Sequence, residues 1–287
     1  MATNFTAVPK PRTTTRIQRR FEELGRRGEM GVVAFITAGD PSLEATESFV
    51  LALDAAGADV IELGVPFSDP VADGPAIQRS SERALHAGTT LAGVLDLIAS
   101  IRRQSDVPMV LFSYYNPVLQ MGVGSFARRA ATAGADGVLI TDLTPEEAGD
   151  YRRIVHANGL DTIFLAAPTS TDERLARIAE ASSGFLYVIS RTGVTGAREN
   201  LPEDLPGFIR RVRRASKLPI AVGFGISLPG QVSVLGGLAD AAVVGSALVQ
   251  EIETAPSVDA AREALGARVR SLKQAGRTGM SRREPGA

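Results

Sequence analysis

The sequence predicts an α/β fold, a (β/α)8 TIM barrel with an extra N-terminal helix. Three observations support this prediction: eight short apolar runs recur along the chain, helical segments separate them, and 287 residues suffice for one such barrel. An open doubly wound sheet is the alternative for the same alternation. Because no linker-like composition divides the chain, we expect a single domain over residues 1–287, with flexible termini at 1–12 and 276–287.

The first element is a basic amphipathic helix expected over residues 13–27, where Ile17, Phe21 and Leu24 recur at spacings of four and three. The eight apolar runs follow it. Each is bounded by Gly, Pro or Asp and is almost wholly apolar, as strands buried on both faces are. The runs cover residues 32–36, 60–63, 108–112, 137–140, 162–165, 185–189, 220–222 and 241–244.

The segments between the runs carry helix signals. Thr-Pro-Glu-Glu at 144–147 and Ser-Thr-Asp-Glu at 170–173 have the spacing of capping boxes, so each predicts a helix start. An Ala-Asp pair precedes three of the runs, at 58–59, 135–136 and 239–240. This weak internal repeat favours duplicated strand-helix units.

Composition excludes several classes of function. Hydrophobic residues make up 44% of the chain and charged residues 22%, with a formal net charge of −1, so nothing favours nucleic acid or a membrane surface. The chain has no cysteine, which excludes disulfides, thiol nucleophiles and thiolate metal sites. No apolar run has the length of a signal peptide core or a bilayer span, and we expect a cytoplasmic protein.

Two carboxylates around the second run are the candidate catalytic groups. Alternation places Glu62 with Val60 on one face of the expected strand, and Asp73 lies in the Pro- and Gly-rich loop that follows. Apolar surroundings raise the pKa of a carboxylate, which prepares it as a general acid or base. The alternative for Glu62 is a partly buried side chain satisfied by backbone amides.

Lysine and histidine are poorly placed for catalysis in a barrel, where reacting groups follow the C-terminal ends of the strands. Lys217 precedes the seventh run, and His86 and His156 fall within expected helices. A Schiff-base lysine or a histidine metal site is therefore not expected, and we predict neither a metal nor a cofactor in this chain.

Glycine-rich loops follow the last two runs. Gly225 lies in the first loop, and Gly245 with Ser246 lies in the second. Glycine lets backbone approach a ligand, and helix N-terminal amides attract anions, so two adjacent loops favour a phosphate site over plain helix capping. The loop at 190–196, rich in Gly and hydroxyl side chains, fits a lid or an ordinary mobile loop.

Several aromatic residues lie in or just beyond expected strand ends. They are Phe35, Phe112, Tyr114, Tyr187 and Phe224. Core packing is the default interpretation of aromatic residues in a barrel. Their gathering at one rim would suit a flat aromatic substrate.

With these carboxylates, loops and aromatic residues, the sequence closely resembles the tryptophan synthase alpha subunit family, over roughly residues 21–251. The most specific segments are Glu-Leu-Gly-Val-Pro-Phe-Ser-Asp-Pro-Val-Ala-Asp-Gly-Pro at 62–75 and Ser-Arg-Thr-Gly-Val-Thr-Gly at 190–196. Phe-Gly-Ile-Ser at 224–227 and Ser-Tyr-Tyr-Asn-Pro at 113–117 add to the resemblance.

The resemblance implies reversible retro-aldol cleavage of indole-3-glycerol phosphate to indole and glyceraldehyde 3-phosphate. It makes Glu62 the general acid/base, Asp73 the acceptor of the indole N–H, and Thr195 the residue that closes over the site. The implied phosphate ligands are Gly196, Gly225, Gly245 and Ser246. The implied substrate-binding residues are Phe35, Phe112, Tyr114, Leu139, Leu165, Tyr187, Thr195 and Phe224.

The resemblance also implies a partner, the tryptophan synthase beta subunit, in an alpha2-beta2 tetramer contacted near residues 66–70 and Asn116. Pyridoxal phosphate would belong to that partner. Two other hypotheses stay open. One is a stand-alone indole-releasing lyase. The other is a catalytically silent phosphate-binding or scaffolding barrel, which the paired carboxylates and the phosphate loops disfavour.

Overall fold

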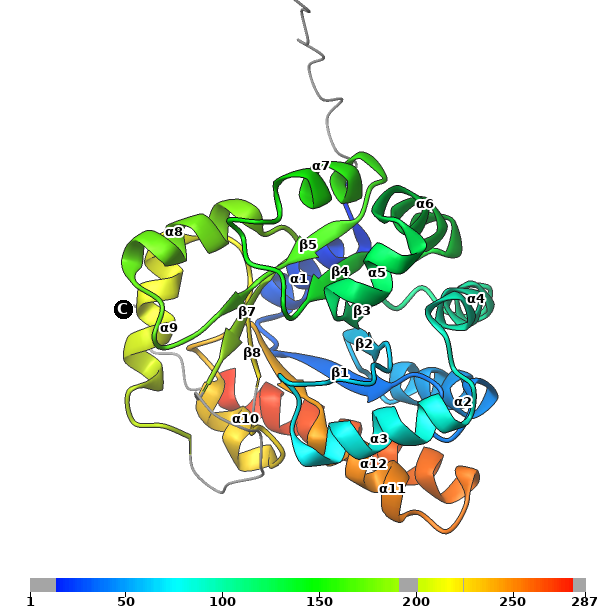
Figure 1. The fold of residues 1–287 in the computed structure, drawn as a ribbon. Coiled ribbons are helices and arrows are strands. Elements are labelled where there is room, and N and C mark those ends of the chain that lie inside the picture. The colour runs from blue at the N-terminus through cyan, green and yellow to red at the C-terminus, as the bar shows by residue number, and fades with distance from the viewer. Residues whose placement is uncertain (1–13, 191–200, 224, 281–287) are drawn as a thin grey trace, which may run out of the picture.

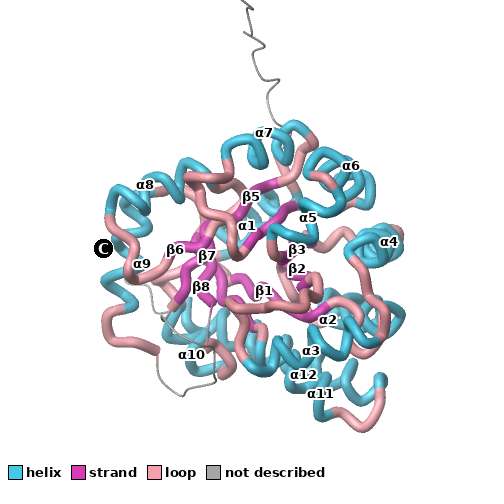
Figure 2. The backbone as a smooth tube through the Cα atoms, viewed as in Figure 1, coloured by secondary structure: helices cyan, strands magenta, loops and turns pink. Residues whose placement is uncertain are grey.

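The computed structural model describes residues 14–190, 201–223 and 225–280, without the side chains of residues 278–280. Over these residues a ring of helices surrounds a barrel of parallel strands (Figures 1 and 2). The strands are β1 (Gly31–Thr37), β2 (Val60–Gly64), β3 (Met109–Ser113), β4 (Gly137–Ile140), β5 (Asp161–Ile163), β6 (Leu165–Ala166), β7 (Leu186–Ile189), β8 (Ile220–Gly223) and β9 (Ala241–Val244).

Helix α1 precedes the first strand, and one or two helices follow every strand except β5, which leads directly to β6. They are α1 (Arg16–Arg27), α2 (Leu43–Ala55), α3 (Pro75–His86), α4 (Leu91–Arg102), α5 (Tyr115–Met121), α6 (Val123–Ala133), α7 (Gly149–Ala157), α8 (Asp172–Ala181), α9 (Leu205–Ala215), α10 (Pro229–Leu235), α11 (Ser246–Thr254) and α12 (Val258–Met280).

The strand order explains how the barrel closes. Strands pair in the order β5-β4-β3-β2-β1-β9-β8-β7-β6, and every pairing is parallel. The two ends of this order, β5 and β6, follow each other in the chain and are separated by Phe164 alone. The fifth predicted strand is thus divided in two, and the same segment joins both edges. The barrel prediction is confirmed, and the open-sheet alternative is wrong.

Two predicted helix boundaries differ from the structure. Thr144 does not cap a helix, because its hydroxyl donates to the Glu147 carboxylate at 3.0 Å and the segment forms a turn, so that α7 begins only at Gly149. The N-cap of α8 is Thr171 rather than Ser170, and its hydroxyl accepts from the Arg174 amide. At the C-terminus, α12 extends to Met280, five residues into the segment expected to be flexible.

Side chains inside the barrel form one apolar cluster, and those between strands and helices form another. Along the strands, residues of the inner cluster alternate with residues of the outer one. Val33 and Phe35 on β1, for example, belong to the inner cluster, as do Val110 and Phe112 on β3. Ile17, Phe21 and Leu24 of α1 belong to this inner cluster, and all three are buried. Helix α1 therefore covers one end of the barrel with the apolar face that its sequence predicts.

The Ala-Asp repeat has a common structural role at the N-terminal ends of the strands. In each case the Asp amide donates to a carbonyl of the neighbouring strand, and the Asp carboxylate accepts from the amide of that same residue, all at 2.7–2.9 Å. The pairs are Asp59 with Val32, Asp136 with Met109, and Asp240 with Ile220. These carboxylates therefore extend the backbone pairing by one hydrogen bond.

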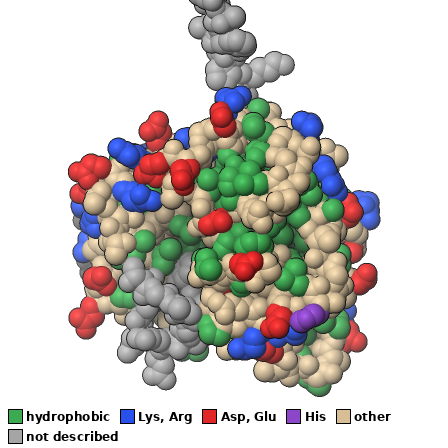
Figure 3. All heavy atoms as spheres, in the orientation of Figure 1, with side chains coloured by type: hydrophobic (Ala, Val, Ile, Leu, Met, Phe, Trp, Pro, Cys, Tyr) green, Lys and Arg blue, Asp and Glu red, His purple; other side chains and the backbone are tan. Residues whose placement is uncertain are grey.

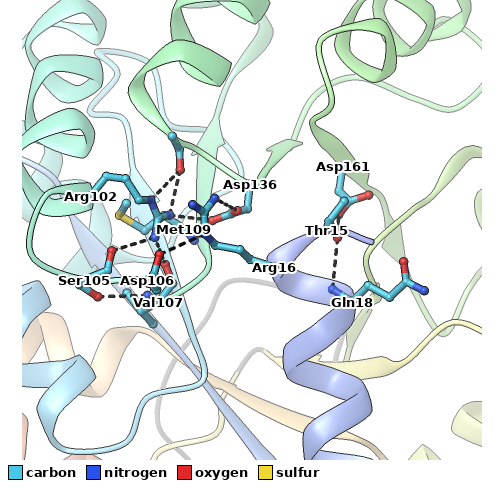
Figure 4. A network of polar contacts seen from close by, with 11 residues as sticks. Thr15, Arg16, Gln18, Arg102, Ser105, Asp106, Val107, Met109, Asp136 and Asp161 are labelled. Carbon is cyan, nitrogen blue, oxygen red and sulfur yellow. Dashed lines mark hydrogen bonds and ion pairs between the residues drawn. The ribbon is translucent and has the colours of Figure 1, made fainter. Parts of the chain in front are cut away.

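Cations pair with all three carboxylates and attach helices to this end of the barrel, with Arg213 of α9 lying 2.6 Å from Asp240. Lys273 of α12 lies 2.7 Å from Asp59, and Arg102 of α4 lies 2.8 Å from Asp136. Arg16 of α1 reaches the same Asp136 at 3.2 Å. Figure 4 shows Arg16 and Arg102 converging on Asp136 from different elements. The loops that connect each strand to the next helix lie at the opposite end of the barrel, where the strands have their C-termini.

Candidate active site

Glu62 lies in the middle of β2, with Phe35 of β1 and Val110 of β3 as its Cα partners. Its side chain is wholly buried, and neither carboxylate oxygen has a hydrogen-bond partner among the described residues. The alternative of a glutamate satisfied by backbone amides therefore does not hold over that part of the chain. Burial raises the pKa of Glu62 from 4.5 to about 8, because ionisation would place an unpaired charge in apolar surroundings.

Asp73 lies at the end of the loop between β2 and α3, next to Gly74, the N-cap of α3. The Tyr114 hydroxyl donates to Asp73 Oδ2 at 3.1 Å. Burial raises the pKa of Asp73 to about 6, and the bond from Tyr114 opposes this rise. The two carboxylates thus differ in their surroundings as two acids with different roles should.

Tyr187 connects the two carboxylates electrostatically. Its ring on β7 is buried, and burial raises the pKa of its hydroxyl well above the ordinary value, with further contributions from the charges of Glu62 and Asp73. Both carboxylates therefore lie within electrostatic reach of one phenol inside the barrel.

A pocket of about 600 Å³, solvent at its mouth included, opens beside these groups. The residues that line it come from β1, β3, β7 and β9, from the loops after β2, β8 and β9, and from the first turns of α3 and α11. They are Phe35, Ala72, Asp73, Gly74, Ile77, Phe112, Tyr187, Gly225, Ile226, Ser227, Val243, Gly245, Ser246 and Ala247. On the face turned to the viewer in Figure 3, hydrophobic side chains gather around the middle, with acidic side chains among them.

Two glycines make room for the aromatic rings of the pocket. A Cβ atom on Gly64 would lie 2.6 Å from Cζ of Phe35, and one on Gly223 would lie 2.4 Å from the Tyr187 hydroxyl. The Phe35 ring in turn meets Phe112 edge-on, with centroids 5.2 Å apart and an interplanar angle of 76°. These contacts fix the aromatic wall.

The other end of the pocket offers backbone amides. Gly245 is the N-cap of α11 and Ser246 begins the helix, so the first amides of α11 lack intrahelical partners and attract an anion. Gly225 has a φ of +87°, a conformation that favours glycine. The structure thus brings the two glycine loops together on one pocket, and phosphate binding there stays a prediction.

Sequence reasoning did not identify Gln231, which supports this end of the pocket. Its side-chain carbonyl accepts from the amides of Ser227 and Leu228 at 2.8 and 2.9 Å, and its Nε2 donates to Gly225 O at 3.2 Å. The turn at 225–228 is therefore held from inside α10. A glutamine three positions into a Pro-initiated helix was the available signal.

The structure brings together seven of the predicted site residues on the pocket wall: Phe35, Asp73, Phe112, Tyr187, Gly225, Gly245 and Ser246. Glu62, Tyr114 and Leu139 are buried nearby but do not line the wall, and half-buried Leu165 packs against the inner cluster. Thr195, Gly196 and Phe224 lie outside the described residues. Gly74 was missed, although Gly-Pro at 74–75 is a helix-start signal.

Residues 14–190, 201–223 and 225–280 contain no group of three or more His, Asp or Glu side chains that could hold a metal ion. Within the same ranges, no single helix is long and apolar enough to cross a membrane. Helices α3 and α4 taken together would be long and apolar enough, but the chain bends by 95° between them.

Comparisons with known proteins point to one family. The family model of the tryptophan synthase alpha chain matches residues 21–277. Relatives of that name from Geotalea daltonii and Solibacter usitatus are 51% and 54% identical over 238 and 239 residues, covering 83% of this chain and 90% of each relative.

Solved structures agree with the sequence comparisons. Tryptophan synthase subunit alpha from Legionella pneumophila gives a TM-score of 0.85 at 39% identity, covering 92% of this chain and 98% of that one. A chain of Mycobacterium tuberculosis tryptophan synthase gives 0.84 at 36% identity, covering 92% and 99%. On sequence, fold and pocket together, this chain belongs to the tryptophan synthase alpha chain family.

Proposed function

We propose that Glu62 and Asp73 divide the chemistry of the family's reaction, the cleavage of indole-3-glycerol phosphate to indole and glyceraldehyde 3-phosphate. The observation that carries this proposal is the wholly buried Glu62, which has no hydrogen-bond partner in the described chain and a pKa raised to about 8. A carboxylic acid that stays protonated near neutral pH can deliver a proton to carbon.

The proton balance uses Glu62 twice. Protonated Glu62 gives its proton to the indole carbon that bears the glycerol chain, which places a positive charge on the indole ring. The resulting carboxylate takes the proton of the adjacent side-chain hydroxyl. The bond between ring and chain then breaks, and its electron pair returns to the ring as the aldehyde forms. Glu62 ends protonated, ready for the next turnover.

Asp73 acts on the other side of the ring in this proposal. As a carboxylate it accepts the indole N–H and stabilises the positive charge that develops there. Its pKa of about 6 leaves it mostly ionised at pH 7, when Glu62 is mostly protonated. The two carboxylates therefore hold opposite protonation states over the pH range between their pKa values.

The pocket fits the two parts of this substrate. Phe35, Phe112 and Tyr187 provide flat apolar surface for indole, with Leu139 and Leu165 behind them. Gly225, Gly245 and Ser246 line the end of the pocket that receives the phosphate. The roles that the family resemblance gives to Thr195, Gly196 and Phe224 stay predictions, because these three residues lie outside the described ones.

The assembly of the chain is proposed from its relatives. Solved structures similar to this chain include a tryptophan synthase complex from Pyrococcus furiosus, 40% identical with a TM-score of 0.79. We infer that this chain docks on a beta subunit through residues 66–70 and Asn116, in an alpha2-beta2 tetramer in the cytoplasm. Val71 and Leu119 support this surface, because they expose 86% and 50% of their area beside it. Pyridoxal phosphate belongs to the partner.

The direct test is indole release from indole-3-glycerol phosphate, measured for the parent and for Glu62→Gln and Asp73→Asn, each with and without a beta subunit. We expect both variants to lose activity, and inorganic phosphate to inhibit the parent competitively. Full activity without the beta subunit would favour a stand-alone lyase. Phosphate binding without any indole release would favour a silent barrel and contradict the proposal.

A further inference from the structure

Tyr114 joins the loop between β2 and α3, residues 65–74 and hereafter the catalytic loop, to the barrel through its hydroxyl group. The residue follows β3 as the N-cap of α5, and only 3% of its area is exposed. The hydroxyl oxygen accepts from the Ala72 amide at 2.9 Å, and the hydroxyl donates to Asp73 Oδ2 at 3.1 Å. One phenol hydroxyl thus forms hydrogen bonds with two consecutive residues of a loop, the nearer of them 41 positions away in sequence.

The ring of Tyr114 holds the same loop at a second point. It packs against Phe67, with centroids 5.0 Å apart and an interplanar angle of 30°. Between these two attachments the loop turns outward, and the side chain of Val71 is 86% exposed. Tyr114 therefore fixes both limbs of a loop that has neither helix nor strand between β2 and α3.

Tyr114 lies behind Asp73 as seen from the pocket. Asp73 lines the pocket wall, whereas Tyr114 is not among the lining residues. We propose that Tyr114 is a positioning residue, which holds Oδ2 of Asp73 and so orients Oδ1 to accept the indole N–H. This inference rests on the proposed function of Asp73, and it assigns Tyr114 a role other than direct substrate contact.

The two hydrogen bonds of Tyr114 reinforce each other. A hydroxyl that accepts from an amide becomes a better donor, so the Ala72 amide strengthens the bond to Asp73. Tyr187 from β7 and Glu62 from β2 are the other titratable groups that share this environment. Within the described chain, Tyr114 provides the one hydrogen bond that opposes the burial-driven rise in the pKa of Asp73.

The test is Tyr114→Phe in the full chain, which keeps the ring against Phe67 and removes the hydroxyl. We expect kcat/KM to fall about tenfold, the order expected for one hydrogen bond to a charged group. The acidic limb of the pH profile should move to higher pH, because Asp73 loses the donor that favours its carboxylate. Loss of packing alone would not move that limb.

Tyr115→Phe is the matched control. Tyr115 is the next residue. Its ring packs against Tyr151, with centroids 5.9 Å apart, rather than against the catalytic loop. This control should keep the rate and pH profile of the parent. A second variant carries 3-fluorotyrosine at position 114 alone. Its hydroxyl is a stronger donor and keeps the shape of tyrosine, so the acidic limb should move to lower pH.

The outcomes separate this inference from the function on which it rests. If Asp73→Asn keeps parental activity, the proposed role of Asp73 is wrong. If Asp73→Asn is inactive while Tyr114→Phe and the fluorotyrosine variant both keep the parental rate and acidic limb, Tyr114 does not position Asp73. Opposite shifts in the two Tyr114 variants, with Tyr115→Phe unchanged, support the inference.

Discussion

Glu62 and Asp73 differ in one hydrogen bond: Asp73 accepts from a tyrosine hydroxyl, whereas Glu62 has no partner among the described residues. Glu62 is also the more deeply buried of the two. Both differences act in the same direction, so the pKa of Glu62 rises to about 8 and that of Asp73 only to about 6. The order of the two pKa values decides which carboxylate serves as acid.

The first prediction concerns the pH dependence of activity. Asp73 must be ionised and Glu62 protonated, so kcat/KM should be bell-shaped, with limbs near pH 6 and pH 8. Because the two groups share one site, the limbs belong to the pair rather than to either residue. Initial rates from pH 4.5 to 10 at low substrate concentration provide the measurement. A rate that stays level from pH 5 to 10 would contradict the assignment.

The second prediction concerns stability. The pKa of Glu62 is 4.5 when unfolded and about 8 when folded, so the folded state binds more protons between these values. Protonated Glu62 makes its full contribution to the stability of the parent below about pH 4.5. This contribution is lost as the pH rises through 8. Glu62→Gln stays neutral, so its melting temperature relative to the parent should increase with pH.

Activity and stability should therefore diverge in this variant. Glu62→Gln should lose activity by about a hundred- to ten-thousandfold while becoming the more stable protein in alkaline buffer. Thermal unfolding at pH 5, 7 and 8.5 measures the difference. Glu263→Gln, on the exposed side of α12, controls for the loss of a surface carboxylate. A melting difference that does not change with pH would show that Glu62 is not titrating in this range.

The third prediction concerns the aromatic wall. Gly64→Ala would place a methyl group 2.6 Å from Cζ of Phe35, so the ring must move. Because Phe35 lines the pocket and packs on Phe112, we expect a higher KM and a loss of stability of about 1–3 kcal/mol from overpacking. Steady-state kinetics and thermal unfolding measure both effects.

Two variants control for this interpretation. Gly149→Ala has open space around the new methyl group and should leave KM unchanged. Adding Phe35→Leu to Gly64→Ala should restore part of the lost stability, because the smaller side chain removes the clash. If the double variant is no more stable than Gly64→Ala alone, the clash with Phe35 is not the cause.

The barrel and the positions of the two carboxylates could be predicted because both follow from local sequence. Short apolar runs specify buried strands, and alternation along 60–64 places Glu62 inside. The alternation held at every strand that lines the inner cluster. The Ala-Asp repeat was visible as a pattern, although its paired hydrogen bonds with the preceding strand were not foreseen.

The remaining features depend on contacts between distant residues. Phe164 divides the fifth strand because the barrel closes there, which is a property of the whole sheet. Thr144 has the sequence of a helix cap, but its hydroxyl bonds the Glu147 side chain instead. The bond between Tyr114 and Asp73 joins two loops, and no local pattern in either loop specifies it.

A group of ion pairs between α3 and α11 motivates the last prediction. Glu253 of α11 bonds Arg79 of α3 through both oxygens at 2.7 Å and Arg83 of α3 at 2.9 Å. Arg83 also bonds Asp40, which is 2% exposed, at 2.7 and 2.8 Å. Helices α3 and α11 both begin at the pocket, at Gly74 and Gly245. The ion pairs join the last turn of α11 to the middle and C-terminal half of α3.

We therefore expect Glu253→Gln to loosen the alignment of α11 and weaken inhibition by inorganic phosphate about threefold, a change of less than about 1 kcal/mol. Glu251→Gln is the matched control, because Glu251 lies on the same helix but bonds Arg268 of α12 at 3.2 Å. Both variants should lower the melting temperature slightly, since partly exposed ion pairs contribute about 1 kcal/mol or less. Only Glu253→Gln should change the inhibition constant. Equal inhibition constants for the parent and both variants would mean that these ion pairs stabilise the fold without aligning the phosphate end of the pocket.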